Sequence, residues 1–159
     1  MKKRTKSMLI AATVLVAMVC VINAVWLVVQ SGGIAGWYGV NMQGAVWNED
    51  VLGLQRFLLL GRLLAGIAFD VLMVVFMVKS LVAVRSGILF PRANAFVLIA
   101  ASVCYFLYSI CNTNMGILID SERLFMINDS DLMIPLVLFA FALIYSMAVR
   151  VSEENNLTI

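Results

Sequence analysis

Two charged side chains, Arg62 and Asp70, lie inside a stretch that is otherwise apolar enough to cross a lipid bilayer. The stretch covers residues 57–79 and reads FLLLGRLLAGIAFDVLMVVFMVK. A charged side chain near the centre of a spanning helix costs about 2.5 to 3.5 kcal/mol on insertion scales, so intramembrane charges often mark functional sites. These two residues are therefore the first candidates for chemistry.

Helix geometry places the two charges in separate polar layers. Eight residues correspond to about 12 Å of rise and about 80° of rotation after full turns, so the two side chains share a broad face but cannot touch. Counting depth along neighbouring spans puts Ser102 and Tyr105 level with Asp70. The same counting puts Asn23 level with Arg62. We expect Asp70 to bond Ser102 or Tyr105, and Arg62 to bond Asn23.

Each charge admits a functional and a structural interpretation. A buried carboxyl that cycles between neutral and charged forms would make Asp70 the proton or cation site of a small ion-coupled transporter. The alternative is that Asp70 only fastens helices together through hydrogen bonds. Arg62 is either a ligand clamp or an anchor near the membrane interface.

The composition predicts an all-α integral membrane protein with one domain. Of the 159 residues, 64% are hydrophobic and 13% are charged, against roughly 45 to 50% and 25% in soluble domains. Four apolar stretches are long enough to span a bilayer, at about residues 8–29, 57–79, 94–115 and 133–149. We expect a four-helix bundle over residues 1–159. Small residues predict that the second span packs most closely, namely Gly61, Ala65, Gly66 and Ala68.

The distribution of lysine and arginine predicts that both termini face the cytoplasm. With four spans, eight basic residues fall on the side of the termini: Lys2, Lys3, Arg4, Lys6, Lys79, Arg85, Arg92 and Arg150. Only Arg56 and Arg123 fall on the opposite side.

Several other kinds of site lack their sequence patterns. The chain has no histidine, and its cysteines, Cys20, Cys104 and Cys111, form no CxxC pair, so neither a catalytic triad nor a zinc or other cofactor motif is indicated. The net charge of +2 with no basic stripe gives no indication of direct nucleic-acid binding. Enzymatic activity accordingly has little support.

The two longer connections are predicted to be ordinary loops. The glycine- and tryptophan-rich residues 30–56 lack the features of a phosphate cradle and favour a loop along the membrane interface. The second connection carries four acidic residues without the calcium-loop spacing, which predicts a solvated acidic segment: Asp120, Glu122, Asp129 and Asp131.

Two short stretches on the side of the termini are more distinctive than the spans. Residues 87–94 read GILFPRAN, and residues 153–159 read EENNLTI. Together they resemble an uncharacterised family of small bacterial membrane proteins with a G-x-x-F-x-x-x-N loop and a tail similar to Glu-Asn-Asp-Leu-Thr-Ile. The positions that match are Gly87, Phe90, Asn94, Glu154, Asn155, Leu157, Thr158 and Ile159. The chain departs from the pattern at Asn156, where the family usually has aspartate.

The resemblance implies four helices in the bacterial inner membrane and no established activity. Some family members look like partners of small helix-turn-helix regulators, which implies a sensing or regulatory role through a protein partner. From the residues alone, the loop is either a helix connection or a partner site. The tail is either a frayed end or an extended docking segment around Thr158. Association with a second copy also stays open.

Overall fold

The computed structural model describes residues 3–39, 44–86 and 91–157, and that part of the chain is helical without any strand. Four long helices follow one another: α1 (Lys3–Ala35), α2 (Leu52–Arg85), α3 (Arg92–Thr113) and α4 (Asp129–Leu157). Short 3₁₀ helices, η1 (Glu49–Val51) and η2 (Asn114–Leu118), precede α2 and follow α3. All four long helices are long and apolar enough to cross a membrane, as the sequence predicted.

The helices extend past most of the predicted spans. The last span was expected over residues 133–149, whereas α4 runs from Asp129 to Leu157. Likewise α1 includes residues 30–35, which were expected to begin the interfacial loop. Hydropathy marks the part of a helix that suits lipid, but polar residues continue the same backbone hydrogen bonding into water. Only α3 ends earlier than expected, at Thr113, where the tighter η2 begins.

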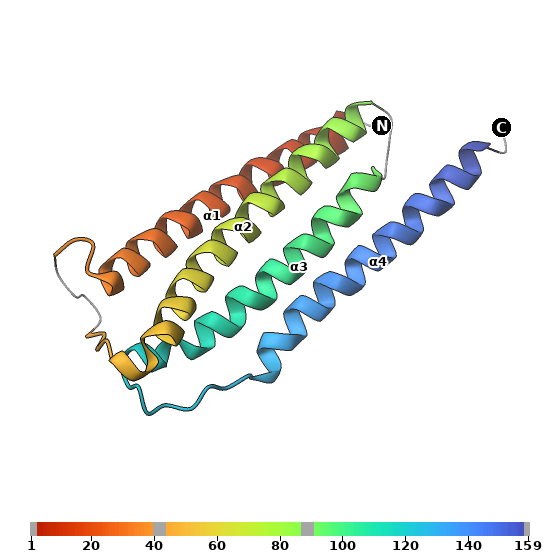
Figure 1. The fold of residues 1–159 in the computed structure, drawn as a ribbon. Coiled ribbons are helices and arrows are strands. Elements are labelled where there is room, and N and C mark those ends of the chain that lie inside the picture. Colours follow the sequence, from red (N-terminus) through yellow and green to blue (C-terminus); the bar gives the residue numbers. More distant parts are fainter. Residues whose placement is uncertain (1–2, 40–43, 87–90, 158–159) are drawn as a thin grey trace.

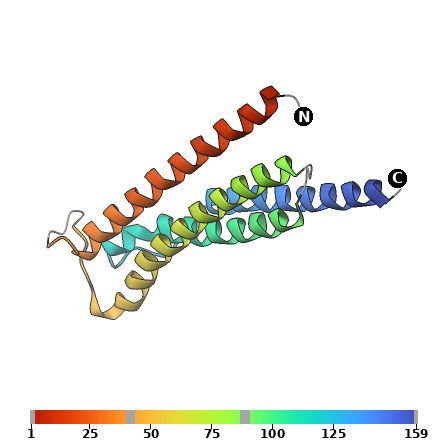
Figure 2. The same cartoon turned by 90° about the horizontal axis from the view of Figure 1, so that it is seen from above.

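The helices form an open row (Figure 1). The backbones of consecutive helices contact each other, α1 with α2, α2 with α3, and α3 with α4. Within the described chain, α1 and α4 make no such contact. Figure 2 shows α1 leaning away from the other helices toward its N-terminal end. The predicted bundle is thus open, with α2 and α3 in the middle.

The row has two ends that differ in what they carry. The start of α1, the end of α2, the start of α3 and the end of α4 lie at the same end of the row (Figure 1), and we call this the terminal end. The α1–α2 and α3–α4 connections lie at the opposite, distal end. A buried apolar cluster lies at the distal end and comprises Ile34, Ala45, Leu58, Leu59, Cys111, Ile117 and Leu118.

Glycines on α2 let both neighbouring helices approach closely. A Cβ at Gly66 would lie 2.6 Å from Leu27 Cδ1 of α1 and 3.1 Å from Tyr108 of α3. A Cβ at Gly61 would lie 2.8 Å from Cys111 Sγ of α3. The predicted close-packing surface is confirmed at these positions, and it is used within one chain.

The packing of α1 on α2 leaves part of α2 uncovered at the distal end. Leu27 lies against Gly66, and Asn23 bonds Asp70, which fixes the antiparallel register of the two helices. Continuing that register puts Ala35 opposite about residue 58, so α2 overhangs α1 by about 9 Å. The overhang forms a shelf beyond the end of α1.

Candidate functional site

Asp70 is bonded to α1. Asn23 Nδ2 donates a hydrogen bond of 2.8 Å to Asp70 Oδ2, and Asp70 is only 6% exposed. The expected partners on α3 were wrong. The Ser102 hydroxyl donates instead to the carbonyl oxygen of Pro135 at 3.0 Å, and the Tyr105 ring packs edge-on against Phe69.

Arg62 joins α2 to both of its neighbours. Its Nε donates to Asn112 Oδ1 of α3 at 2.9 Å, and its Nη2 donates to Gln30 Oε1 of α1. The expected bond to Asn23 was wrong. Within the described chain no carboxylate lies within 4.0 Å of Arg62, although its side chain is 8% exposed. Two neutral amides therefore hold a buried cation.

The two polar layers exist at separate levels of α2, but their partners differ from those expected. The expectation assumed that the spans are centred on one plane. In the structure α1 is displaced along α2 toward the terminal end, so Asn23 reaches the level of Asp70 and Gln30 reaches the level of Arg62. Leu27 lies against Gly66 in this displaced register. Hydropathy alone does not reveal such a contact.

Asp131 was wrongly assigned to the solvated acidic segment. It is 2% exposed, and its Oδ1 accepts hydrogen bonds from the hydroxyls of Ser109 and Thr113, both at 2.7 Å. Its Oδ2 accepts the Asn128 backbone N–H at 2.9 Å, an arrangement similar to a capping box at the start of α4. The spacing of Asn128 and Asp131 was the signal in the sequence.

Gln55, which sequence reasoning missed, holds the connection between α1 and α2 in place. It is fully buried, and its Nε2 donates to the carbonyl oxygens of Val46 at 3.0 Å and Ile117 at 3.1 Å. Its Oε1 accepts the Asn48 backbone N–H at 3.1 Å. The backbone is thus fixed on both sides of Trp47.

A helix cap positions a second tryptophan. Gly36 follows the last residue of α1 with a φ of 74°, and the Trp37 N–H donates to the Gly32 carbonyl oxygen at 2.9 Å. This is the geometry of a Schellman motif, which requires glycine after the helix end. A Cβ at Gly32 would lie 2.9 Å from the Trp37 ring. The absence of that atom lets Trp37 fold back over the end of α1.

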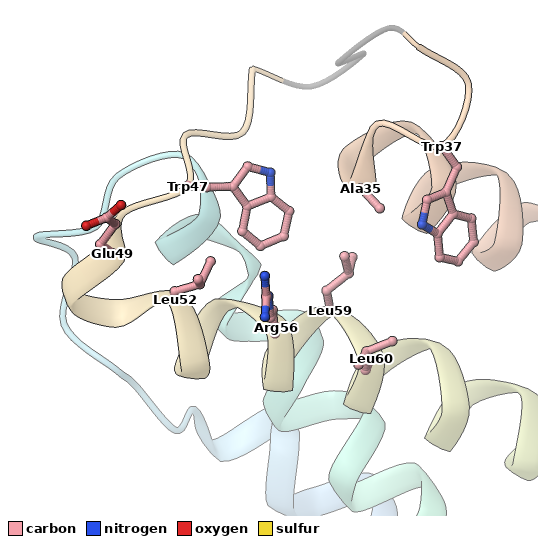
Figure 3. Close-up of a pocket in the computed structure, with 8 residues that line it drawn as sticks. All are labelled: Ala35, Trp37, Trp47, Glu49, Leu52, Arg56, Leu59 and Leu60. Atoms are coloured by element: carbon pink, nitrogen blue, oxygen red, sulfur yellow. The ribbon is translucent and has the colours of Figure 1, made fainter.

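The two tryptophans enclose a hollow on the α2 shelf. Its volume is about 610 Å³, within the range of ligand pockets. It is lined by Ala35, Trp37, Trp47, Glu49, Leu52, Arg56, Leu59 and Leu60. Figure 3 shows Trp47 and Glu49 on one side and Trp37 on the other, with Arg56 and Leu59 between them. We call this hollow the distal pocket.

The charged groups of the distal pocket have no partners in the part of the chain that the structure describes. Neither Arg56 nor Glu49 forms a side-chain hydrogen bond or an ion pair within the described residues. Arg56 is exposed. Arg62 lies about 1.7 turns further along α2, and its guanidinium is engaged on two sides. The pocket can therefore offer both charges to a ligand.

The motif residues at the terminal end are only partly described. Asn94 is fully buried, and its Nδ2 donates to Ser80 Oγ of α2 at 2.8 Å. Glu154 is exposed and lies on α4. The remaining positions, or their side chains, lie outside the described residues: Gly87, Phe90, Asn155, Leu157, Thr158 and Ile159. The backbone is helical through Leu157, and the extended segment around Thr158, one of the two alternatives for the tail, lies mostly outside the described residues.

Comparison with protein-family models, with curated proteins and with solved structures found no match. The resemblance in the loop and tail therefore stays a prediction. Among the side chains that the structure describes, no group of three or more cysteines or carboxylates is arranged to hold a metal ion.

Proposed function

We propose that this protein is an inner-membrane interaction or sensing protein that engages a protein partner through its terminal end in the cytoplasm. Within the membrane, Asp70, Asn23, Arg62 and Ser102 all bond across helix interfaces. Such bonds fasten helices together. The surfaces available to a partner then lie at the ends of the row.

The charges at the two ends support a cytoplasmic terminal end. Lys79, Arg85, Arg92 and Arg150 lie on the parts of α2, α3 and α4 nearest that end. The distal end carries the basic residues Arg56 and Arg123 together with several carboxylates. An excess of lysine and arginine on one side of the membrane is typical of the cytoplasmic side.

The observation that carries the proposal is the continuation of α4 beyond its apolar part. Arg150 is the first charged residue after the apolar stretch, and the helix runs on to Leu157, a projection of about 12 Å. Arg92 Nη2 of α3 donates to Glu153 Oε2 at 2.9 Å. The first turn of the projecting part of α4 is thus held beside the first residue of α3.

Site-specific photocrosslinking in native membranes tests this proposal. A photoreactive amino acid replaces Val151, which is 56% exposed on the projecting part of α4. The matched control replaces Leu124, which is 81% exposed at the distal end. We expect a discrete protein adduct from position 151 that disappears when residues 153–159 are deleted.

Adducts of equal amount and size from positions 151 and 124 would contradict the proposal. An adduct of twice the chain mass from position 151 would identify a second copy as the partner. Deleting residues 153–159 removes the exposed ion pair between Arg92 and Glu153, with 74% of the Arg92 side chain and 46% of the Glu153 side chain accessible. Because such pairs contribute about 0 to 1 kcal/mol, thermal stability in detergent should stay nearly unchanged.

One observation favours a second candidate function, an ion-coupled transporter. Asp70 and Cys20 line a hollow of about 220 Å³ between α1 and α2, which gives the carboxyl group space beside its bond to Asn23. An Asp70→Asn variant in proteoliposomes that hold a pH-sensitive dye distinguishes the two functions. If the protein is an interaction protein, the wild type, the variant and empty vesicles should all give the same proton flux. If it is a carrier, the wild type should give a flux above that of empty vesicles, and the variant should lose it.

A further inference from the structure

We infer that the distal pocket binds the headgroup of a zwitterionic phospholipid, with the phosphate at Arg56, the ammonium group toward Glu49 and an acyl chain along α2. This inference concerns the end opposite the proposed partner surface and does not depend on it.

The contrast between two arginines on α2 indicates an external anion. Arg62 is 8% exposed and is held by two amide oxygens from the protein. Arg56 is exposed, lines the pocket, and lacks any partner within the described residues. Guanidinium groups bind phosphate oxygens through parallel N–H donors. Arg56 is therefore the group in this pocket that would recognise a phosphate.

Glu49 indicates that the ligand carries a positive charge as well. It lines the same pocket as Arg56, yet the two side chains form no ion pair. A ligand that carried only negative charge would be attracted by one residue and repelled by the other. A zwitterionic headgroup offers a charge of the matching sign to both.

The position and the walls of the pocket favour a membrane lipid over a soluble zwitterion. Trp37 is 57% exposed and Trp47 is 39% exposed, and such rings settle at the depth of lipid headgroups. The apolar wall continues down α2 from Leu60 to Leu64, one turn further on, and both side chains are exposed. This surface leads from the pocket along the span, where an acyl chain would lie.

Contacts elsewhere in the fold hold the residues that line the pocket in place. Trp37 is placed by the cap at Gly36, and the backbone beside Trp47 is fixed by Gln55. Leu59, which forms the floor, is 5% exposed and belongs to the buried distal cluster. A pocket whose walls are fixed in this way loses little conformational entropy when a ligand binds.

Native mass spectrometry of the full chain tests the inference. The protein is released from nanodiscs that contain equal amounts of phosphatidylethanolamine, which is zwitterionic, and phosphatidylglycerol, which is anionic. We expect the wild type to retain phosphatidylethanolamine preferentially. Arg56→Gln should lower that retention about tenfold, because it removes a charge-assisted hydrogen bond. Arg123→Gln, which removes an exposed arginine at the same end but outside the pocket, should retain the lipid as the wild type does.

Glu49→Gln separates the zwitterionic preference from phosphate binding. It should keep a bound lipid but shift the preference toward phosphatidylglycerol. Equal retention by Arg56→Gln and the wild type would overturn the inference, and so would a wild-type preference for phosphatidylglycerol. Displacement of the lipid by free phosphoethanolamine, at concentrations that leave the Arg123→Gln control folded, would assign the pocket to a soluble ligand instead.

Discussion

Arg62 shows how a membrane protein can keep a cation in its interior without a carboxylate. The planar guanidinium has donors on different sides, and one reaches Asn112 on α3 while another reaches Gln30 on α1. Because α2 stands between those two helices, one side chain ties three helices at a single level. Within the membrane-spanning part, such bonds contribute about 0.6 kcal/mol on average and up to about 1.7 kcal/mol.

Replacing Arg62 with lysine should therefore lower stability although the charge is kept. The ammonium group of lysine is a compact point charge and cannot reproduce the fork that reaches both amides. We expect the free energy of unfolding in detergent to fall by about 1 kcal/mol, measured by denaturant titration. Arg123→Lys, at an exposed position, is the control and should change nothing. Equal stability of both variants would show that the two amide contacts contribute no free energy.

At the scale of the helices, Gly66 sets how α1, α2 and α3 fit together. It leaves room for Leu27 on one side and Tyr108 on the other, and Leu27 is only 1% exposed. The same contact displaces α1 along α2, which brings Asn23 to Asp70 and uncovers the shelf of the distal pocket. One missing side chain thus determines both the polar partners and the pocket.

Gly66→Leu should separate these helices and destabilise the row. Inserting side-chain atoms where a Cβ alone would lie 2.6 Å from Leu27 costs about 1 to 3 kcal/mol by overpacking. Gly53→Leu is the matched control, because nothing lies within 4 Å of a Cβ at that position of α2. Its stability should stay the same or rise by about 0.5 kcal/mol, since leucine favours helix more than glycine does. Thermal unfolding in detergent measures both, and a lower stability for Gly53→Leu than for Gly66→Leu would contradict this role of Gly66.

The sequence predicted the helices well and their mutual register poorly. Hydropathy locates apolar stretches because burial in lipid depends on composition, so all four helices were found. It carries no information about how far one helix slides along another, and hence Asn23 was paired with Arg62 instead of Asp70. Gln55 was missed and Asp131 was wrongly placed in a solvated segment for a related reason, because the folded chain supplies their partners from distant positions, such as Ile117 for Gln55 and Ser109 for Asp131.

At the scale of the whole molecule, the row separates two kinds of surface. The terminal end combines basic residues with the projecting part of α4, whereas the distal end carries the tryptophans, the distal pocket and most of the carboxylates. If the helices span a membrane, the proposed partner surface and the proposed lipid site lie on its opposite faces. This arrangement requires that the two ends be exposed to different compartments.

Cysteine labelling in spheroplasts tests that requirement. The native cysteines lie within α1 and α3, where Cys20 and Cys111 are buried and Cys104 is partly buried, so the unmodified chain supplies the background signal for a membrane-impermeant maleimide. We expect Leu124→Cys, at the distal end, to react in intact spheroplasts. Ser86→Cys, which is exposed after the end of α2, should react only after the membrane is permeabilised, because the excess of lysine and arginine predicts that this end faces the cytoplasm. Labelling of Ser86→Cys but not Leu124→Cys in intact spheroplasts would reverse the orientation and place the projecting helix outside the cell.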